Sequence, residues 1–144
     1  MKLLLIDGNS IINRAYYGIR PLSTTTGIPT NALFGFLNIL IKHISEEKPD
    51  MCAVAFDLKE KTFRHKRFSE YKGTRSAMPE DLAAQMPLAK ELLDALKICR
   101  VEKGGIEADD IIGILSQRVS DAGGTCVIVT GDRDSLQLVS DSVT

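Results

Sequence analysis

The sequence predicts an α/β fold with a mainly parallel sheet that is covered by helices on both faces. Short apolar runs alternate with longer stretches of helical periodicity, which is typical of strands joined by crossover helices. Acidic residues directly follow several apolar runs, and open α/β sheets bind ligands at the carboxyl ends of their strands. A length of 144 residues, 44% of them hydrophobic, suits one domain with a real core.

The first half of the chain contains two predicted strands and two predicted helices. Residues 2–6 form a short apolar run that ends in turn residues, as a buried strand does. A short helix is expected over 10–17 and a loop over 21–29. Asn31 can cap a long helix that continues to about residue 47. The second strand is expected over 51–56. The long helix is expected to bury Leu33, Phe34, Leu37, Leu40, Ile41 and Ile44.

The second half of the chain continues the alternation. Pro79, followed by Glu80 and Asp81, suits a helix start. Pro87 within the same helix predicts a kink or a later start. This helix is expected to end near residue 97 and to bury Leu82, Met86, Leu92, Leu93 and Leu96. Strands are expected over 98–101 and 125–130, and between them a helix over 108–122 that ends at Gly123-Gly124. A further helix is expected to start at Asp134, and the last residues are expected to begin a fifth strand.

Composition excludes some classes of protein. No apolar run approaches the ~20 residues of a membrane span. Cys52, Cys99 and Cys126 are far apart in short apolar runs, which favours buried, reduced thiols and a cytoplasmic location. The net charge of −1 hides a local asymmetry, because the segment 59–75 is strongly basic while the strand ends are acidic.

Seven carboxylates occupy strand ends or one helix start, and they are the candidate metal ligands. Gathered at one edge they would repel one another, so they lie apart, some are protonated, or cations hold them together. Hard oxygen ligands suit Mg²⁺ or Mn²⁺, and two such ions about 3.5–4 Å apart can clamp a displacement at phosphorus. Turn formation, helix capping and complementation of a helix dipole are the alternative roles. The seven are Asp7, Asp57, Glu107, Asp109, Asp110, Asp132 and Asp134.

The basic segment suggests contact with a polyanion. Its cations can neutralise phosphates, and its aromatic side chains can stack on unpaired bases. A solvated surface loop whose aromatic residues pack on the core is the alternative. The segment contains Lys59, Lys61, Phe63, Arg64, Lys66, Arg67, Phe68, Tyr71, Lys72 and Arg75. His43 and His65 are expected to be structural or surface residues rather than ligands.

Several motifs together resemble the 5′–3′ exonuclease domain of bacterial DNA polymerase I, which is related to flap endonucleases and other PIN-like nucleases. The resemblance implies a single domain over 1–144 with a PIN-like three-layer α/β/α fold and a basic arch at about 58–78. The motifs are Leu5-Ile6-Asp7-Gly8-Asn9-Ser10, the stretches 27–32 and 54–57, Phe63-Arg64-His65, Tyr71-Lys72-Gly73-Thr74-Arg75, the stretch 107–113, and Val129-Thr130-Gly131-Asp132-Arg133-Asp134.

The family resemblance implies a divalent-metal phosphodiesterase that acts on 5′ ends and flaps of DNA in replication and repair. Two Mg²⁺ or Mn²⁺ ions would occupy the complete site. Lys72 and Arg75 would act on the scissile phosphate as catalytic residues. The first ion would be held by Asp7, Asp57, Glu107 and Asp109 with support from Asp110, the second by Asp132 and Asp134, and the DNA by Arg14, Arg64, Tyr71, Lys72 and Arg75.

The resemblance also predicts what this chain lacks. Family members continue past Thr144 with two further acids and an element that grips duplex DNA. The chain is therefore expected to be truncated at its C-terminus, either as the N-terminal part of a DNA polymerase I or as a short protein that needs a partner segment. A catalytically incomplete nucleic-acid-binding module remains open, and so does a phosphotransfer receiver or phosphatase.

Overall fold

The computed structural model describes residues 1–58 and 77–144. Most of the predicted basic arch falls between these two ranges. The predictions for Arg64, Tyr71, Lys72 and Arg75, and the one for His65, therefore lie outside the described residues.

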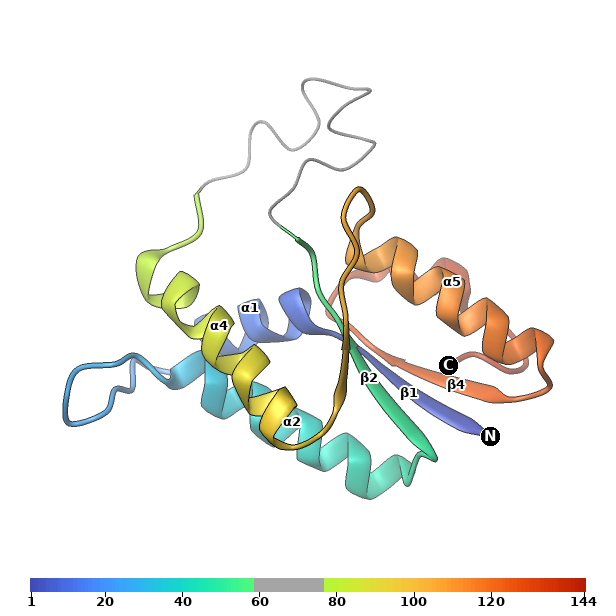
Figure 1. Cartoon of the computed structure of the whole chain (residues 1–144), viewed down its shortest axis with the longest axis horizontal. Helices are drawn as coiled ribbons and strands as arrows, with labels where there is room; N and C mark the ends of the chain where they lie inside the picture. Colours follow the sequence, from blue (N-terminus) through green and yellow to red (C-terminus); the bar gives the residue numbers. More distant parts are fainter. Residues whose placement is uncertain (59–76) are drawn as a thin grey trace.

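Within the described residues, four parallel strands form the sheet, in the order β3-β2-β1-β4 (Figure 1). Asp7 at the end of β1 pairs with Ala55 of β2, and Ile6 pairs with Val129 of β4. The predicted parallel sheet is confirmed. The strands are β1 (Lys2–Asp7), β2 (Met51–Ala55), β3 (Cys99–Val101) and β4 (Thr125–Val129).

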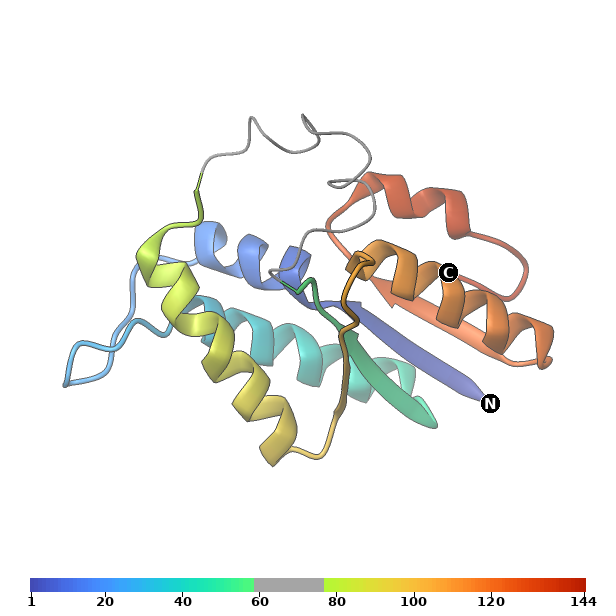
Figure 2. The ribbon, with the colours of Figure 1, turned by 45° about the horizontal axis from the view of Figure 1, so that its top comes forward.

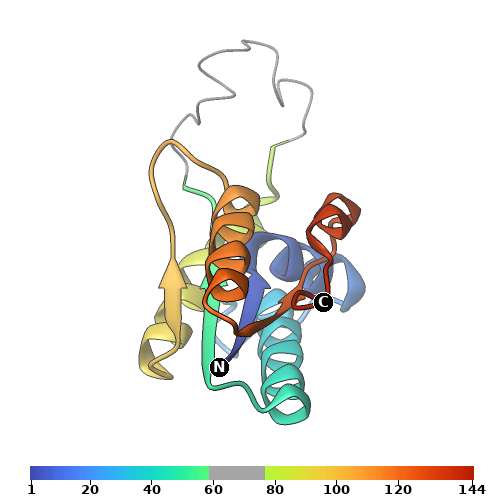
Figure 3. The same ribbon diagram turned by 90° about the vertical axis from the view of Figure 1, so that its right-hand side faces the viewer.

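Helices cover both faces of the sheet, which gives three layers (Figures 1 and 3). Of the helices that the structure describes, α1, α2 and α4 pack on one face and α5 packs on the other. A turn of 3-10 helix, η1, follows β4. The helices are α1 (Gly8–Gly18), α2 (Asn31–Glu47), α4 (Glu80–Ala95), α5 (Ala108–Asp121) and η1 (Arg133–Leu138).

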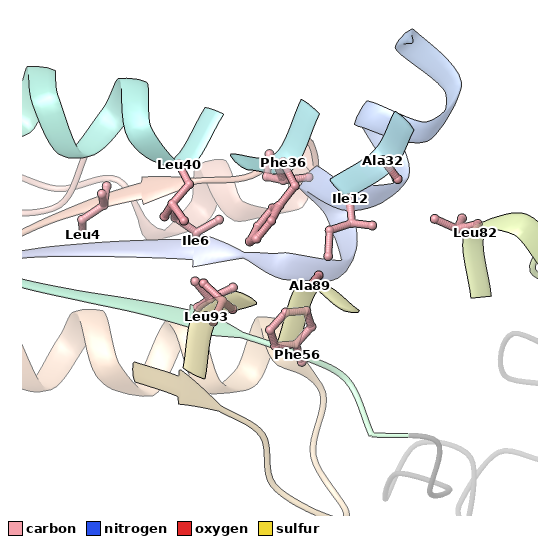
Figure 4. Packing of buried hydrophobic residues seen from close by; sticks show 12 residues of the cluster. Leu4, Ile6, Ile12, Ala32, Phe36, Leu40, Phe56, Leu82, Ala89 and Leu93 are labelled. Atoms are coloured by element: carbon pink, nitrogen blue, oxygen red, sulfur yellow. The ribbon is translucent and has the colours of Figure 1, made fainter. Parts of the chain in front are cut away.

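The core is divided by the sheet, because successive side chains of a strand point to opposite faces. Leu4 and Ile6 of β1 pack beneath Phe36 and Leu40 of α2, as Figure 4 shows. Leu3 and Leu5 lie in the second cluster, against α5. Burial on both faces explains why the strand segments read as continuous apolar runs rather than alternating ones.

The outward faces of two helices correct part of the predicted core. Phe34 and Ile41 of α2 are 52% and 53% exposed, and Leu96, just after α4, is 47% exposed. Each helix is covered by the sheet and its neighbours on one side only, so apolar residues on its other side face solvent. Cys99 is also exposed, because β3 is an edge strand. Cys126 is buried as predicted, and Cys52 is partly buried.

The predicted cap of α2 is wrong. Thr30 occupies the N-cap position, and the buried Asn31 side chain instead donates to the carbonyl oxygens of Tyr16 and Ile19, each at 3.1 Å. Gln85 of α4, which is fully buried, donates to Asn31 Oδ1 at 2.9 Å and accepts from the backbone N–H of Leu33 at 3.0 Å. Asn31 and Gln85 therefore form an amide knot that joins α1, α2 and α4.

Other local predictions have mixed outcomes. Helix α4 runs through Pro87 from Glu80, so the predicted later start is wrong. Gly123, at φ +75°, ends α5 as predicted, because few other residues adopt this conformation easily. The chain end begins to pair with the outer edge of β4 through a parallel bridge between Cys126 and Val143. In the part of the chain that the structure describes, no helix is long and apolar enough to cross a membrane.

Candidate active site

The carboxyl ends of β1, β2 and β4 bring three of the predicted acids to one edge of the sheet. Asp7 is the last residue of β1, Asp57 follows β2 and Asp132 follows β4. Because the strands are parallel and adjacent, their ends point the same way (Figure 2). The first turn of α5 supplies Asp109 to the same place.

These four acids line a hollow of about 340 Å³, called here the first acidic hollow. Its remaining lining is polar or small and comes from α1 and from Gly131, which follows β4. The complete lining is Asp7, Asn9, Ser10, Asn13, Asp57, Asp109, Gly131 and Asp132.

Asp7 is the most enclosed acid of this hollow, with only 4% of its surface exposed. Its Oδ1 accepts from the backbone N–H of Ser10 at 3.1 Å, which caps α1. Its Oδ2 accepts from the Thr130 hydroxyl at 2.9 Å. Burial raises the pKa of Asp7, the charges of Asp57 and Asp132 add to this, and the two hydrogen bonds oppose it.

Asp57 connects the end of β2 to two other elements. Its Oδ1 accepts from the backbone N–H of Ala108, the first residue of α5, at 2.7 Å. Its own backbone N–H donates to Asn9 Oδ1 at 2.9 Å. Asp57 is thus fixed through its backbone to the start of α1 and through its carboxylate to the start of α5.

The three acids at the start of α5 have different roles. Asp110 Oδ2 accepts from the backbone N–H of Glu107 at 3.2 Å, and the two residues form a capping box. Glu107 and Asp110 therefore have the helix-capping role that was the alternative to metal binding. It does not explain Asp109, whose pKa is raised to about 6 by burial and by the charges of four other acids. Those acids are Asp7, Asp132, Asp57 and Glu107.

Asp134 does not join the first acidic hollow. It lies in η1 and lines a neighbouring, larger hollow of about 580 Å³, the second acidic hollow. Asp109 lines both hollows, so the two share a wall. The structure therefore brings the seven predicted acids to one region but divides them between two adjoining sites. The acids of the second hollow are Glu107, Asp109, Asp110 and Asp134.

The donor set fits a hydrated divalent ion. Over 1–58 and 77–144, no three Asp, Glu, His or Cys side chains are placed to hold one ion among them. Mg²⁺ keeps several waters and needs only one or two carboxylates, so oxygen donors in this arrangement suit it better than zinc. His43 does not contribute, because its Nδ1 bonds the carbonyl oxygen of Ile39 within α2, at 2.8 Å.

Several residues near the acids were not predicted from the sequence. Asn9, Ser10 and Thr130 bond the acids or the turns that carry them. The sequence could have indicated them, because each lies within two or three residues of a predicted acid. Arg14, the predicted DNA contact on α1, lies close by, because it lines a hollow together with Asp132.

The family described as "5'-3' exonuclease, N-terminal resolvase-like domain" matches residues 2–144. The chain belongs to this exonuclease family. It is 46% identical over 143 residues to DNA polymerase I of Caldicellulosiruptor bescii and also 46% identical over 143 residues to DNA polymerase I of Bacillus subtilis. Each alignment covers 99% of this chain but only 17% and 16%, respectively, of those polymerases.

Solved structures of a bacteriophage T5 protein share the fold of this exonuclease chain. The T5 D15 protein co-crystallised with metal ions superposes with a TM-score of 0.78 at 18% identity. A T5 D15 flap endonuclease variant in a pseudo-enzyme-product complex with DNA and metal ions gives 0.72 at 17% identity. Both matches cover 99% of this chain, and they cover 54% and 53% of the T5 chains. The predicted PIN-like three-layer α/β/α class is confirmed.

Proposed function

We propose that the chain is a single PIN-like nuclease domain that hydrolyses DNA phosphodiester bonds as a divalent-metal-dependent 5′–3′ exonuclease or 5′-flap endonuclease. The observation that carries the proposal is the convergence of Asp7, Asp57, Asp109 and Asp132 on one hollow. Such a hollow would provide the oxygen ligands that a phosphodiesterase metal requires.

The relatives support a role in replication and repair as part of a larger protein. Both bacterial relatives are DNA polymerases I, and the chain spans about a sixth of their length. The polymerase or nuclease segment that would follow is a partner of this domain in the proposal. The DNA substrate carries a 5′ end or a 5′ flap.

Each acid has a proposed role in the metal site. Asp7, Asp57, Glu107 and Asp109 hold the first Mg²⁺ or Mn²⁺, directly or through water. Asp132 and Asp134 contribute to the second. A bound ion would activate the attacking water and neutralise charge on the leaving oxygen. Asp110 supports the group by fixing the backbone of Glu107 at the start of α5.

The proposed DNA contacts come partly from the sequence alone. Arg14 lies on α1 beside Asp132, where a DNA backbone that reaches the acids would pass. Arg64 and Tyr71 are proposed to contact the single-stranded 5′ arm. Lys72 and Arg75 are proposed to contact the same arm and to steer and polarise the scissile phosphate.

Cleavage of a 5′-labelled flap substrate in Mn²⁺ tests the proposal. The wild-type chain should cut near the junction, and Asp109→Ala and Lys72→Ala should not. Asp121→Ala removes an acid from the opposite end of α5 and is the matched control, so it should cut like wild type.

A catalytically incomplete DNA-binding module is the second candidate. It would keep the proposed Arg14 contact with DNA, beside Asp132, without the cleavage chemistry. Salt-sensitive binding of the flap without cleavage at any Mn²⁺ concentration would replace the first proposal with this one.

A further inference from the structure

The hydroxyl of Thr130 connects two acids that belong to different strands. Thr130 follows β4 directly and is partly buried. Its Oγ1 donates to Asp7 Oδ2 at 2.9 Å and accepts from the backbone N–H of Asp132 at 3.1 Å. Asp132 Oδ1 in turn accepts from the backbone N–H of Asp134 at 2.9 Å. One continuous chain of hydrogen bonds therefore links Asp7, Asp132 and Asp134.

A second set of hydrogen bonds completes a ring that contains Asp7, Ser10, Thr130 and Gly131. Ser10 donates its backbone N–H to Asp7 Oδ1, and its hydroxyl oxygen accepts from the backbone N–H of Gly131 at 2.8 Å. Gly131 follows Thr130 in the chain, so the segment after β4 is bonded both to the end of β1, at Asp7, and to the start of α1, at Ser10. A Cβ on Gly131 would lie 2.9 Å from Ser10 Oγ, so a larger residue there would force the Ser10 hydroxyl to shift.

The hydroxyl group is the feature of Thr130 that this arrangement uses. A hydroxyl has one proton to donate and lone pairs to accept, so it can serve Asp7 and the Asp132 backbone at once. Asp7 and Asp132 carry like charges, and each opposes the ionisation of Asp109. Nothing in their mutual electrostatics would hold them at a fixed spacing. A neutral hydroxyl between them provides that spacing without another charge.

We propose that Thr130 is a positioning residue that sets the separation of Asp7, proposed for the first divalent ion, and Asp132, proposed for the second. The inference rests on the proposed function, because it assigns the hydroxyl to the same acidic site. Groups that orient metal ligands typically change metal affinity by about 10- to 100-fold when they are removed. A purely structural threonine would affect folding and leave the affinity of the folded protein unchanged.

The test compares Thr130→Val, which keeps the shape and removes the hydroxyl, with Thr130→Ser, which keeps the hydroxyl. Mn²⁺ affinity is measured by calorimetry, and the thermal midpoint is measured on the same metal-free samples. Thr130→Val should weaken Mn²⁺ binding by about tenfold or more. Thr130→Ser should restore wild-type binding. Thr125→Val, at the exposed start of β4, is the matched control and should bind like wild type.

The outcomes separate this inference from the proposed function. Wild-type affinity in Thr130→Val, or equal losses in the Val and Ser variants, would overturn the positioning role alone. No Mn²⁺ uptake by the wild-type chain would overturn both proposals. If Thr130→Val does not fold, Thr130→Ala removes the same hydroxyl with less steric demand, and the same weakening is expected of it.

Discussion

The amide knot and the first acidic hollow both gather polar side chains, but the amides of the knot are buried, whereas in the hollow only Asp7 is buried and Asp109 and Asp132 are exposed. In the knot, Gln85 and Asn31 bond each other and backbone groups of three helices. In the hollow, Asp7 and Asp109 face other carboxylates, and the pKa of each is raised. The amides of the knot are neutral and hydrogen-bonded, whereas the carboxylates of the hollow repel one another, and a bound cation would reduce that repulsion.

The comparison shows that burial of a polar side chain is a weak indicator of function by itself. Among the described residues, the buried polar side chains are Asp7, Asn31, Gln85, Glu107 and Ser116. Hydrogen-bonded amides mark a junction between helices, whereas clustered carboxylates with raised pKa values mark a candidate ligand site. The two regions should therefore respond differently to the same kind of substitution.

The largest expected effect is on Asp109, which lines both hollows. Asp109→Asn should lower the rate of flap cleavage by more than about 100-fold. Loss of a group that only orients the metal ligands typically costs up to about 100-fold, and Asp109 is proposed to be a ligand itself. It should also raise the thermal midpoint of the metal-free chain, because it removes one of several facing negative charges. Cleavage rates and calorimetric melting measure the two effects. A lower midpoint with full activity would contradict the division between the two regions.

The second largest effect is expected on the stabilisation by added metal, which should depend on the first acidic hollow and not on the amide knot. Mn²⁺ at 100 times its Kd should stabilise the wild-type chain by about 2.7 kcal/mol, if it binds only the folded state. Gln85→Leu should gain as much as wild type, and Asp109→Asn should gain almost nothing. Denaturant unfolding with and without Mn²⁺ gives the comparison. Equal gains in all three proteins would place the ion elsewhere.

The amide knot should matter for stability alone. Gln85→Leu leaves Asn31 Oδ1 and the Leu33 N–H without this partner in a buried place and should cost about 2 kcal/mol. Gln117 of α5 is an exposed amide bonded to Asp121, and Gln117→Leu should change stability by less than about 0.5 kcal/mol. Urea unfolding measures both. Loss of Mn²⁺ affinity in folded Gln85→Leu would show that the knot also shapes the site.

The smallest effect is expected at Asp134, the exposed acid of the second acidic hollow. Asp134→Asn should weaken the affinity for one of two bound ions by about tenfold, because water easily replaces an exposed ligand. The first ion, proposed to be held by Asp7, Asp57, Glu107 and Asp109, should be retained. Calorimetric stoichiometry distinguishes the sites, and simultaneous loss of both ions would mean that the two hollows bind as one.

The sequence predicted the strands and the acidic edge because both depend on local signals. Short apolar runs that end in Asp and Gly define strand ends within a residue or two. Parallel order then places Asp7, Asp57 and Asp132 at one edge without further information. The acids at the start of α5 could not be sorted in this way, because capping and ligation use the same residue types.

The errors concern partners that are distant in the chain. Asn31 has the residue type of a helix cap, yet its side chain bonds α1 and the Gln85 amide, which lies 54 residues away. Phe34 and Ile41 follow a helical apolar pattern but lie on the uncovered side of α2. No local pattern indicates which side of a helix receives a neighbour.

By itself, the sequence determined the order of elements, the parallel sheet and the row of acids at its carboxyl edge, because periodicity and turn chemistry act over a few residues. Tertiary packing decided how those acids divide between two hollows, which hydroxyl joins Asp7 to Asp132, and which amides the helices enclose. These outcomes depend on distances between segments that meet only after folding, and a hydrogen bond forms only where two groups arrive within about 3 Å.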